Sequence, residues 1–106
     1  MAFDEGLAER IRDLLPKAVE KRMFGGVAFM ERGNLVVGVL GDEMIARVGP
    51  AATEAALAMP GVRTFDFTGK AMSGWVVVSQ EPVAEDPELR KWVERCQAFA
   101  RTLPAK

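Results

Sequence analysis

Two segments with the composition of strands, joined by a tight turn, constrain the fold of this chain more than any other feature. Residues 27–31 and 35–40 are rich in branched and aromatic apolar side chains, which favour strands. Arg32-Gly33-Asn34 between them has the composition of a hairpin turn. Apolar residues occupy both faces of the second segment, so we expect that strand to be covered on both sides. The pattern therefore predicts an antiparallel hairpin whose second strand is buried.

Apolar residues recur at helical spacing in two longer segments. Residues 4–18 carry one apolar stripe, and Asp4 and Glu5 suit the start of a helix. Pro16 is expected to end or kink this helix nearby, and the cations that follow it would lie at the C-terminal end of the helix. Those cations are Lys17, Lys21 and Arg22. Residues 86–103 carry the second stripe and begin with Asp86-Pro87, a strong signal for a helix start.

Shorter segments complete the predicted order of elements. Residues 44–48, 62–67 and 74–79 are predicted strands, and Pro50 opens a short alanine-rich helix over residues 51–58. The order is α-βββ-α-ββ-α, with short connections. It predicts an α+β fold with one domain over residues 1–106 and an antiparallel sheet of about five strands. Helices at both ends of the chain, and one between the strands, are expected to cover one face of that sheet.

Composition excludes several classes of function. The 106 residues include 14 basic and 15 acidic side chains, and this balance argues against a dedicated nucleic-acid module. There is no histidine or tyrosine and only one cysteine, Cys96, so zinc sites and histidine-assisted nucleophiles cannot be assembled. We expect no metal and no cofactor. Cys96 lies on the apolar stripe of the last helix, which predicts a core thiol in a reducing cytoplasm.

The chain shows no targeting or membrane signal. The N-terminus lacks the basic and apolar regions of a signal peptide. No apolar run approaches the roughly 18 residues of a membrane helix. We therefore expect a cytoplasmic protein that does not contact a membrane.

A short segment of basic residues, apolar residues and two glycines is the main candidate for an interaction site. Its residues are Lys21, Arg22, Met23, Phe24, Gly25 and Gly26. Two adjacent glycines before a strand serve backbone geometry or the close approach of another group. In the structural interpretation Met23 and Phe24 fill the core and the glycines make a bulge or a packing notch. In the functional interpretation the glycines form a surface notch for a partner's backbone.

The loop Gly69-Lys70-Ala71-Met72 is the second candidate. It does not fit a phosphate-binding loop, because Thr64 stands where that motif needs a glycine and Ala71 where it needs serine or threonine. Lys70 and Met72 are kept as candidate interaction residues. An enzyme that uses Lys70 with an acid such as Asp66 is a further, weaker hypothesis.

These segments resemble a known family. Residues 22–34, the Gly69-Lys70-Ala71-Met72 loop before a tryptophan-containing strand, and the closing helix around Leu89 and Trp92 follow the order of the TfoX/Sxy N-terminal domain. The resemblance implies a bacterial regulator of competence genes, thought to act as a coactivator alongside the cyclic-AMP receptor protein. Full-length members carry a C-terminal helical domain, which we expect to be absent here. The resemblance implies no catalytic residue.

The sequence thus predicts a non-catalytic regulatory module that binds a protein partner or itself as a homodimer. The alternative is a transcriptional regulator that binds nucleic acid directly through basic residues of the first helix and Arg22. That alternative predicts an affinity that falls steeply with salt.

Overall fold

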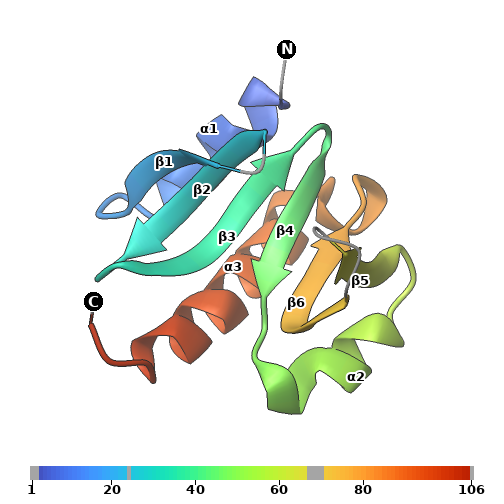
Figure 1. The fold of residues 1–106 in the computed structure, drawn as a ribbon. Coiled ribbons are helices and arrows are strands. Elements are labelled where there is room, and N and C mark those ends of the chain that lie inside the picture. The colour runs from blue at the N-terminus through green and yellow to red at the C-terminus, as the bar shows by residue number, and fades with distance from the viewer. Residues whose placement is uncertain (1–2, 24, 67–70, 106) are drawn as a thin grey trace.

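The computed structural model describes residues 3–23, 25–66 and 71–105. Their order confirms the predicted α+β class (Figure 1). The first half contains α1 (Glu5–Leu14), β1 (Val19–Met23), β2 (Gly26–Glu31), β3 (Asn34–Leu40) and β4 (Glu43–Arg47). The second half contains a 3₁₀ turn (Pro50–Ala52), α2 (Thr53–Leu57), β5 (Val62–Asp66), β6 (Ala71–Val78), a second 3₁₀ turn (Glu81–Val83) and α3 (Asp86–Arg101).

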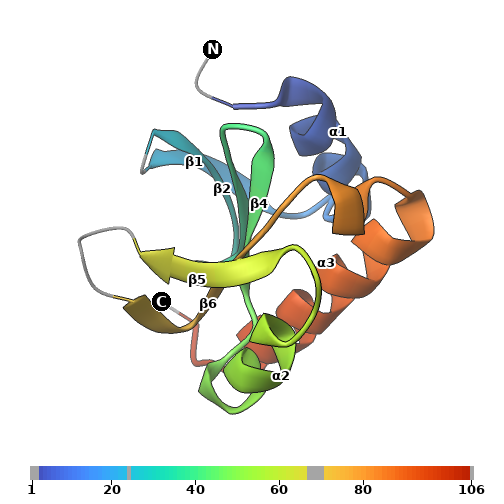
Figure 2. The same cartoon turned by 90° about the vertical axis from the view of Figure 1, so that its right-hand side faces the viewer.

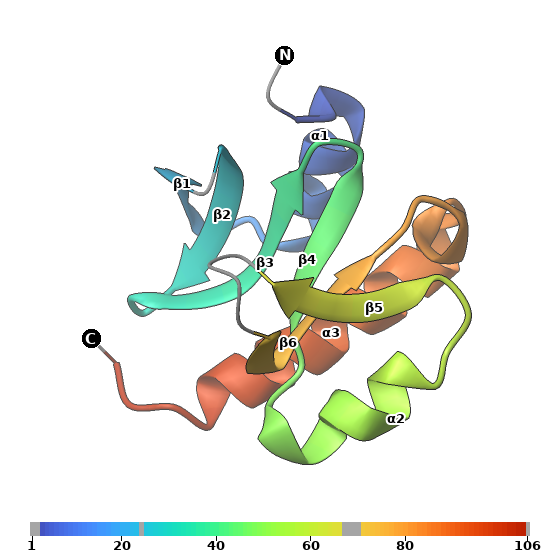
Figure 3. The same cartoon turned by 45° about the vertical axis from the view of Figure 1, so that its right-hand side comes forward.

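The strands form one antiparallel sheet with the order β1-β2-β3-β4-β6-β5. β1 and β5 are therefore its two edges (Figure 3). The sheet has six strands in the described part of the chain, whereas the sequence predicted about five. The additional strand is β1, whose cations Lys21 and Arg22 were predicted to lie at the C-terminal end of the first helix.

The first helix is shorter than predicted, because the proline is not tolerated within it. α1 ends at Leu14, and Leu15 is its C-cap with φ −127° and ψ 67°, outside the helical region. The residue before a proline is driven out of the helical conformation, and a proline also lacks the N–H for a helical hydrogen bond. The placement of Lys21 and Arg22 at a helix end was thus wrong. The predicted start is confirmed, since Asp4 caps the helix by accepting from the Leu7 N–H at 3.1 Å.

The hairpin predicted at Arg32-Gly33-Asn34 is confirmed. Glu31 pairs with Asn34, and Arg32 and Gly33 have φ of 52° and 81°. Positive φ at both central residues is the type I′ pattern, whose twist matches that of the strands. Glycine accepts this conformation without strain, while arginine adopts it at a steric cost.

The main core lies between the sheet and the two long helices. α1 and α3 pack on the same face of the sheet, as Figure 2 shows edge-on. Trp92 and Cys96 of α3 are buried in this core, as the sequence predicted. On the opposite face a smaller cluster contains Ile45, Phe65 and Val77. No helix in the described residues is long and apolar enough to cross a membrane.

Candidate functional site

The candidate residues Lys21, Arg22 and Met23 lie on the edge strand β1. All five residues of this strand are exposed, including Val19 and Met23, whose exposed fractions are 60% and 36%. Within the described chain β1 pairs only with β2, and its other side has no neighbouring strand. An edge of this kind presents backbone N–H and C=O groups that can pair with another chain.

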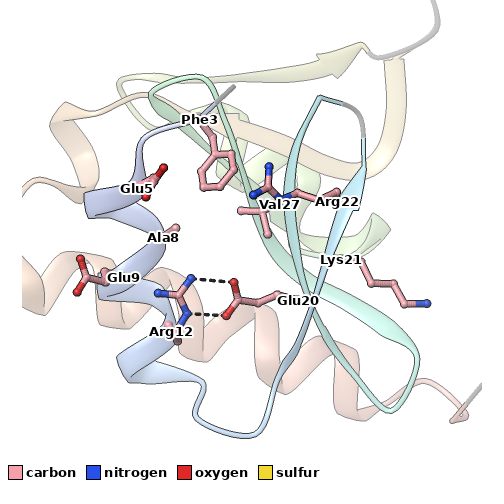
Figure 4. Close-up of a pocket in the computed structure, with 9 residues that line it drawn as sticks. All are labelled: Phe3, Glu5, Ala8, Glu9, Arg12, Glu20, Lys21, Arg22 and Val27. Atoms are coloured by element: carbon pink, nitrogen blue, oxygen red, sulfur yellow. Dashed lines mark hydrogen bonds and ion pairs between the residues drawn. The ribbon is translucent and has the colours of Figure 1, made fainter. Parts of the chain in front are cut away.

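The two faces of β1 have different surroundings. Glu20 and Arg22 point toward α1 (Figure 4). Arg12 of α1 donates to both carboxylate oxygens of Glu20, from Nε at 2.5 Å and from Nη2 at 2.8 Å. The guanidinium carbon of Arg22 lies 5.0 Å from the ring centroid of Phe3, within cation–π range. The Lys21 side chain points away from α1 (Figure 4).

A cleft of about 270 Å³ separates α1 from β1 (Figure 4). It is lined by Phe3, Glu5, Ala8, Glu9, Arg12, Glu20, Lys21, Arg22 and Val27. Both acidic and basic side chains line it, so the cleft does not select strongly for an anion or a cation. The hydrogen bonds from Arg12 lower the pKa of the Glu20 carboxyl, so Glu20 is an anion at neutral pH.

The two glycines of the segment have structural roles. Gly25 lies in the turn before β2 with φ 80°. Gly26 is buried, and a Cβ atom there would lie 2.0 Å from the backbone oxygen of Val39 in β3. The close approach at Gly26 is therefore made by this chain's own sheet, as the structural interpretation of the glycines required. Contact of either glycine with a partner stays a prediction.

The structure does not place the other candidate site residues beside β1. Phe24 and Lys70 lie outside the described residues, and Met72 lies in β6, with its side chain also outside them. In the sheet order β2, β3 and β4 separate β1 from β6. Asp66, the proposed acid partner of Lys70, is exposed at the end of β5.

Sequence reasoning missed three residues that shape the cleft, Phe3, Arg12 and Glu20. The one local signal is Pro16, which ends the first helix and leaves residues 19–23 outside it. Once this segment is a strand, Glu20 and Arg22 share a face, and that face lies over the preceding helix.

Both basic side chains of α1 are held within the fold. Arg10 pairs with Asp86 at the start of α3, and it also donates to the backbone oxygens of Val83 and Ala84. Arg12 is held by Glu20. No group of three or more histidine, cysteine, aspartate or glutamate side chains among residues 3–23, 25–66 and 71–105 is placed to hold a metal ion.

The class defined by this arrangement is a small α+β domain, with two helices on one face of an antiparallel sheet and an exposed edge strand. The model of the TfoX N-terminal domain matches residues 9–100, and the chain therefore belongs to that family. Comparisons with curated proteins and with solved structures gave no significant match.

Proposed function

We propose that this chain is a non-catalytic regulatory module that binds a protein partner, or a second copy of itself, along the outer side of β1. The observation that carries the proposal is the exposure of all five β1 residues at a sheet edge. An extended segment of a partner can add to such an edge, where backbone hydrogen bonds supply affinity and side chains supply selectivity. Membership of the TfoX N-terminal domain family supports a regulatory role.

Direct nucleic-acid binding has weaker support. The hypothesis relied on the basic residues of α1 and on Arg22, but Arg10 and Arg12 are each paired with a carboxylate. The cleft beside Arg22 also carries the acidic residues Glu5, Glu9 and Glu20. A surface that neutralises phosphates needs unpaired cations side by side. Salt-dependent binding of DNA or RNA would favour this alternative.

The proposal can be tested by placing a photo-reactive amino acid at single positions in the protein in bacterial cells. Lys21 on β1 is the test position, and Thr64 is the matched control, because it is exposed at the centre of the opposite edge strand β5. Illumination is followed by nuclease treatment, purification and mass spectrometry.

We expect a specific protein adduct at Lys21 that survives nuclease and is absent at Thr64. An Arg22→Glu substitution in the same protein should weaken this adduct, because it reverses a charge on β1. Equal labelling at both positions, or no adduct at either, would rule out β1 as the binding surface.

A further inference from the structure

The free side of β1 has a defined set of backbone groups. Two residues separate Met23 from Gly26, which face each other across the hairpin. In a two-residue hairpin the closing pair is hydrogen-bonded, and along an antiparallel ladder such pairs alternate with pairs that are not. The N–H and C=O groups of Val19, Lys21 and Met23 thus face β2. Those of Glu20 and Arg22 face outward.

The sequence of β1 is complementary to itself when read in the opposite direction. An antiparallel pair centred on Lys21 places Glu20 opposite Arg22 of the partner subunit, and Arg22 opposite the partner's Glu20. Both contacts join opposite charges on the face toward α1. Val19 then faces the partner's Met23, and these are two of the exposed large apolar side chains of the molecule. Only the central pair, Lys21 with the partner's Lys21, opposes like charges.

We propose that β1 pairs with β1 of a second copy about a two-fold axis at Lys21, which joins the two sheets into one. This inference rests on the proposed function and names the partner. The outward groups of Glu20 and Arg22 supply the backbone hydrogen bonds. Each Glu20 carboxylate, already bound by Arg12, also meets the partner's Arg22. A two-fold contact of this kind is closed and stops at a dimer.

The opposite edge lacks this complementarity. An antiparallel pair of two β5 strands centred on Thr64 would place Val62 opposite Asp66 and Arg63 opposite Phe65. An apolar side chain would then face a charged one in each of these pairs. Apolar pairs and pairs of opposite charge stabilise an antiparallel ladder, whereas an apolar side chain opposite a charged one makes neither contact. β5 is therefore the natural negative control.

The dimer is expected to be weak and to depend on concentration. Five residues of strand span about 17 Å, and the interface is smaller than the roughly 1,200 Å² buried by stable complexes. Lysine on an edge strand also discourages pairing. Lys21 is hence the side chain that limits affinity in the proposed register.

Analytical ultracentrifugation over a wide concentration range tests the proposed register, with substitutions that should change the dimer affinity in opposite directions. Lys21→Thr removes the one repulsive pair and should tighten the dimer about two- to fivefold. Arg22→Glu places a carboxylate opposite the Glu20 carboxylate in both pairs of positions 20 and 22 and should weaken the dimer about tenfold or more. Thr64→Glu on β5 should leave it unchanged. Circular dichroism establishes that each variant folds.

A disulfide tests the register directly. Residue 21 and its copy form a pair without hydrogen bonds, with Cα atoms about 4.5 Å apart, within reach of a disulfide. Mild oxidation of Lys21→Cys should give a species of twice 11.6 kDa on a non-reducing gel. In the Glu20→Cys variant the new cysteine lies opposite position 22 of the second copy and not opposite its own equivalent, so it should cross-link far more slowly. Cys96 is buried and does not compete.

The outcomes separate the two proposals. If wild type and Lys21→Thr are both monomeric at millimolar concentration, self-pairing is overturned, while a photo-adduct with another protein at Lys21 still supports the proposed function. A dimer that Arg22→Glu leaves intact, or that Thr64→Glu disrupts, also overturns self-pairing, because its contact lies elsewhere.

Discussion

Arg32, in the turn between β2 and β3, donates a hydrogen bond to the backbone oxygen of Leu103 at 2.9 Å. The same guanidinium nitrogen reaches the oxygens of Ala100 and Arg101 at 3.3 and 3.0 Å. The last carbonyl groups of a helix have no partner within the helix, and a cation there is also favoured by the helix dipole. A strained turn residue therefore fastens the end of α3 to the sheet. Asn34, 2% exposed, adds a hydrogen bond from Nδ2 to the Pro104 oxygen at 2.9 Å.

Two substitutions at position 32 separate the strain from the hydrogen bonds. Arg32→Ala loses the guanidinium and keeps a residue that disfavours positive φ, so we expect it to lower the free energy of unfolding by about 1–3 kcal/mol. Arg32→Asn also loses the guanidinium but suits a type I′ turn, so its loss should be about 1 kcal/mol smaller. Urea denaturation measures both. Equal losses in the two variants would contradict strain at this residue.

The close approach at Gly26 gives a second prediction. In Gly26→Ala the new methyl group meets a backbone oxygen of Val39, which cannot rotate away, so we expect a loss of about 2–3 kcal/mol. Gly41→Ala is the matched control, because a Cβ atom there has nothing within 4 Å although φ is 60°. Its loss should be about 1 kcal/mol, from backbone strain alone. Thermal and urea unfolding compare the two, and a Gly26→Ala variant as stable as Gly41→Ala would show that β2 and β3 separate easily.

Much of the fold could be predicted from local patterns, and the failures have local causes. The β2–β3 hairpin followed from its turn chemistry, and α3 from its apolar stripe and its Asp86-Pro87 start. β1 was missed because an edge strand with every side chain exposed has no buried face, and so carries no apolar alternation. Its basic residues were therefore interpreted as the C-terminal end of the first helix.

The cleft could not be predicted, since it joins residues of different elements. Arg12 and Glu20 are eight positions apart, and their contact depends on the turn that follows Pro16. Phe3 is placed against Arg22 by an isolated bridge between Phe3 and Gly41, two residues far apart in sequence. Contacts of this kind follow from the whole sheet and not from any one segment.

The burial of Cys96 predicts an inert thiol in the native protein. Burial raises the pKa of the Cys96 thiol from 9.0 to about 12. Because the thiolate is the reactive form, a thiol reagent at pH 8 should label Cys96 only after denaturant is added. The contribution of Cys96 to stability should be fully present below pH 9 and be lost as pH rises from there toward 12, since the unfolded thiol ionises first. Rapid labelling of the native protein would show that the core around α3 opens readily.

The ion pair between Arg63 and Glu43 predicts a loss of stability in acid. Arg63 on β5 reaches across β6 to both carboxylate oxygens of Glu43 on β4, with N···O distances of 2.5 Å. The hydrogen bonds from Arg63 lower the pKa of Glu43 below its ordinary 4.5. The contribution of the pair is thus present above pH 4.5 and is lost as pH falls through the lowered pKa.

Both side chains are partly exposed, so solvent screening limits this contribution to about 1 kcal/mol or less. Glu43→Gln should remove it, which lowers the free energy of unfolding at pH 7 and brings the variant closer to wild type near pH 3. Arg63→Gln should show the same convergence, because it removes the other member of the pair. Urea denaturation at both pH values, in low and high salt, measures the difference. A gap between Glu43→Gln and wild type that stays constant from pH 7 to pH 3 would mean that Glu43 contributes through packing and not through its charge.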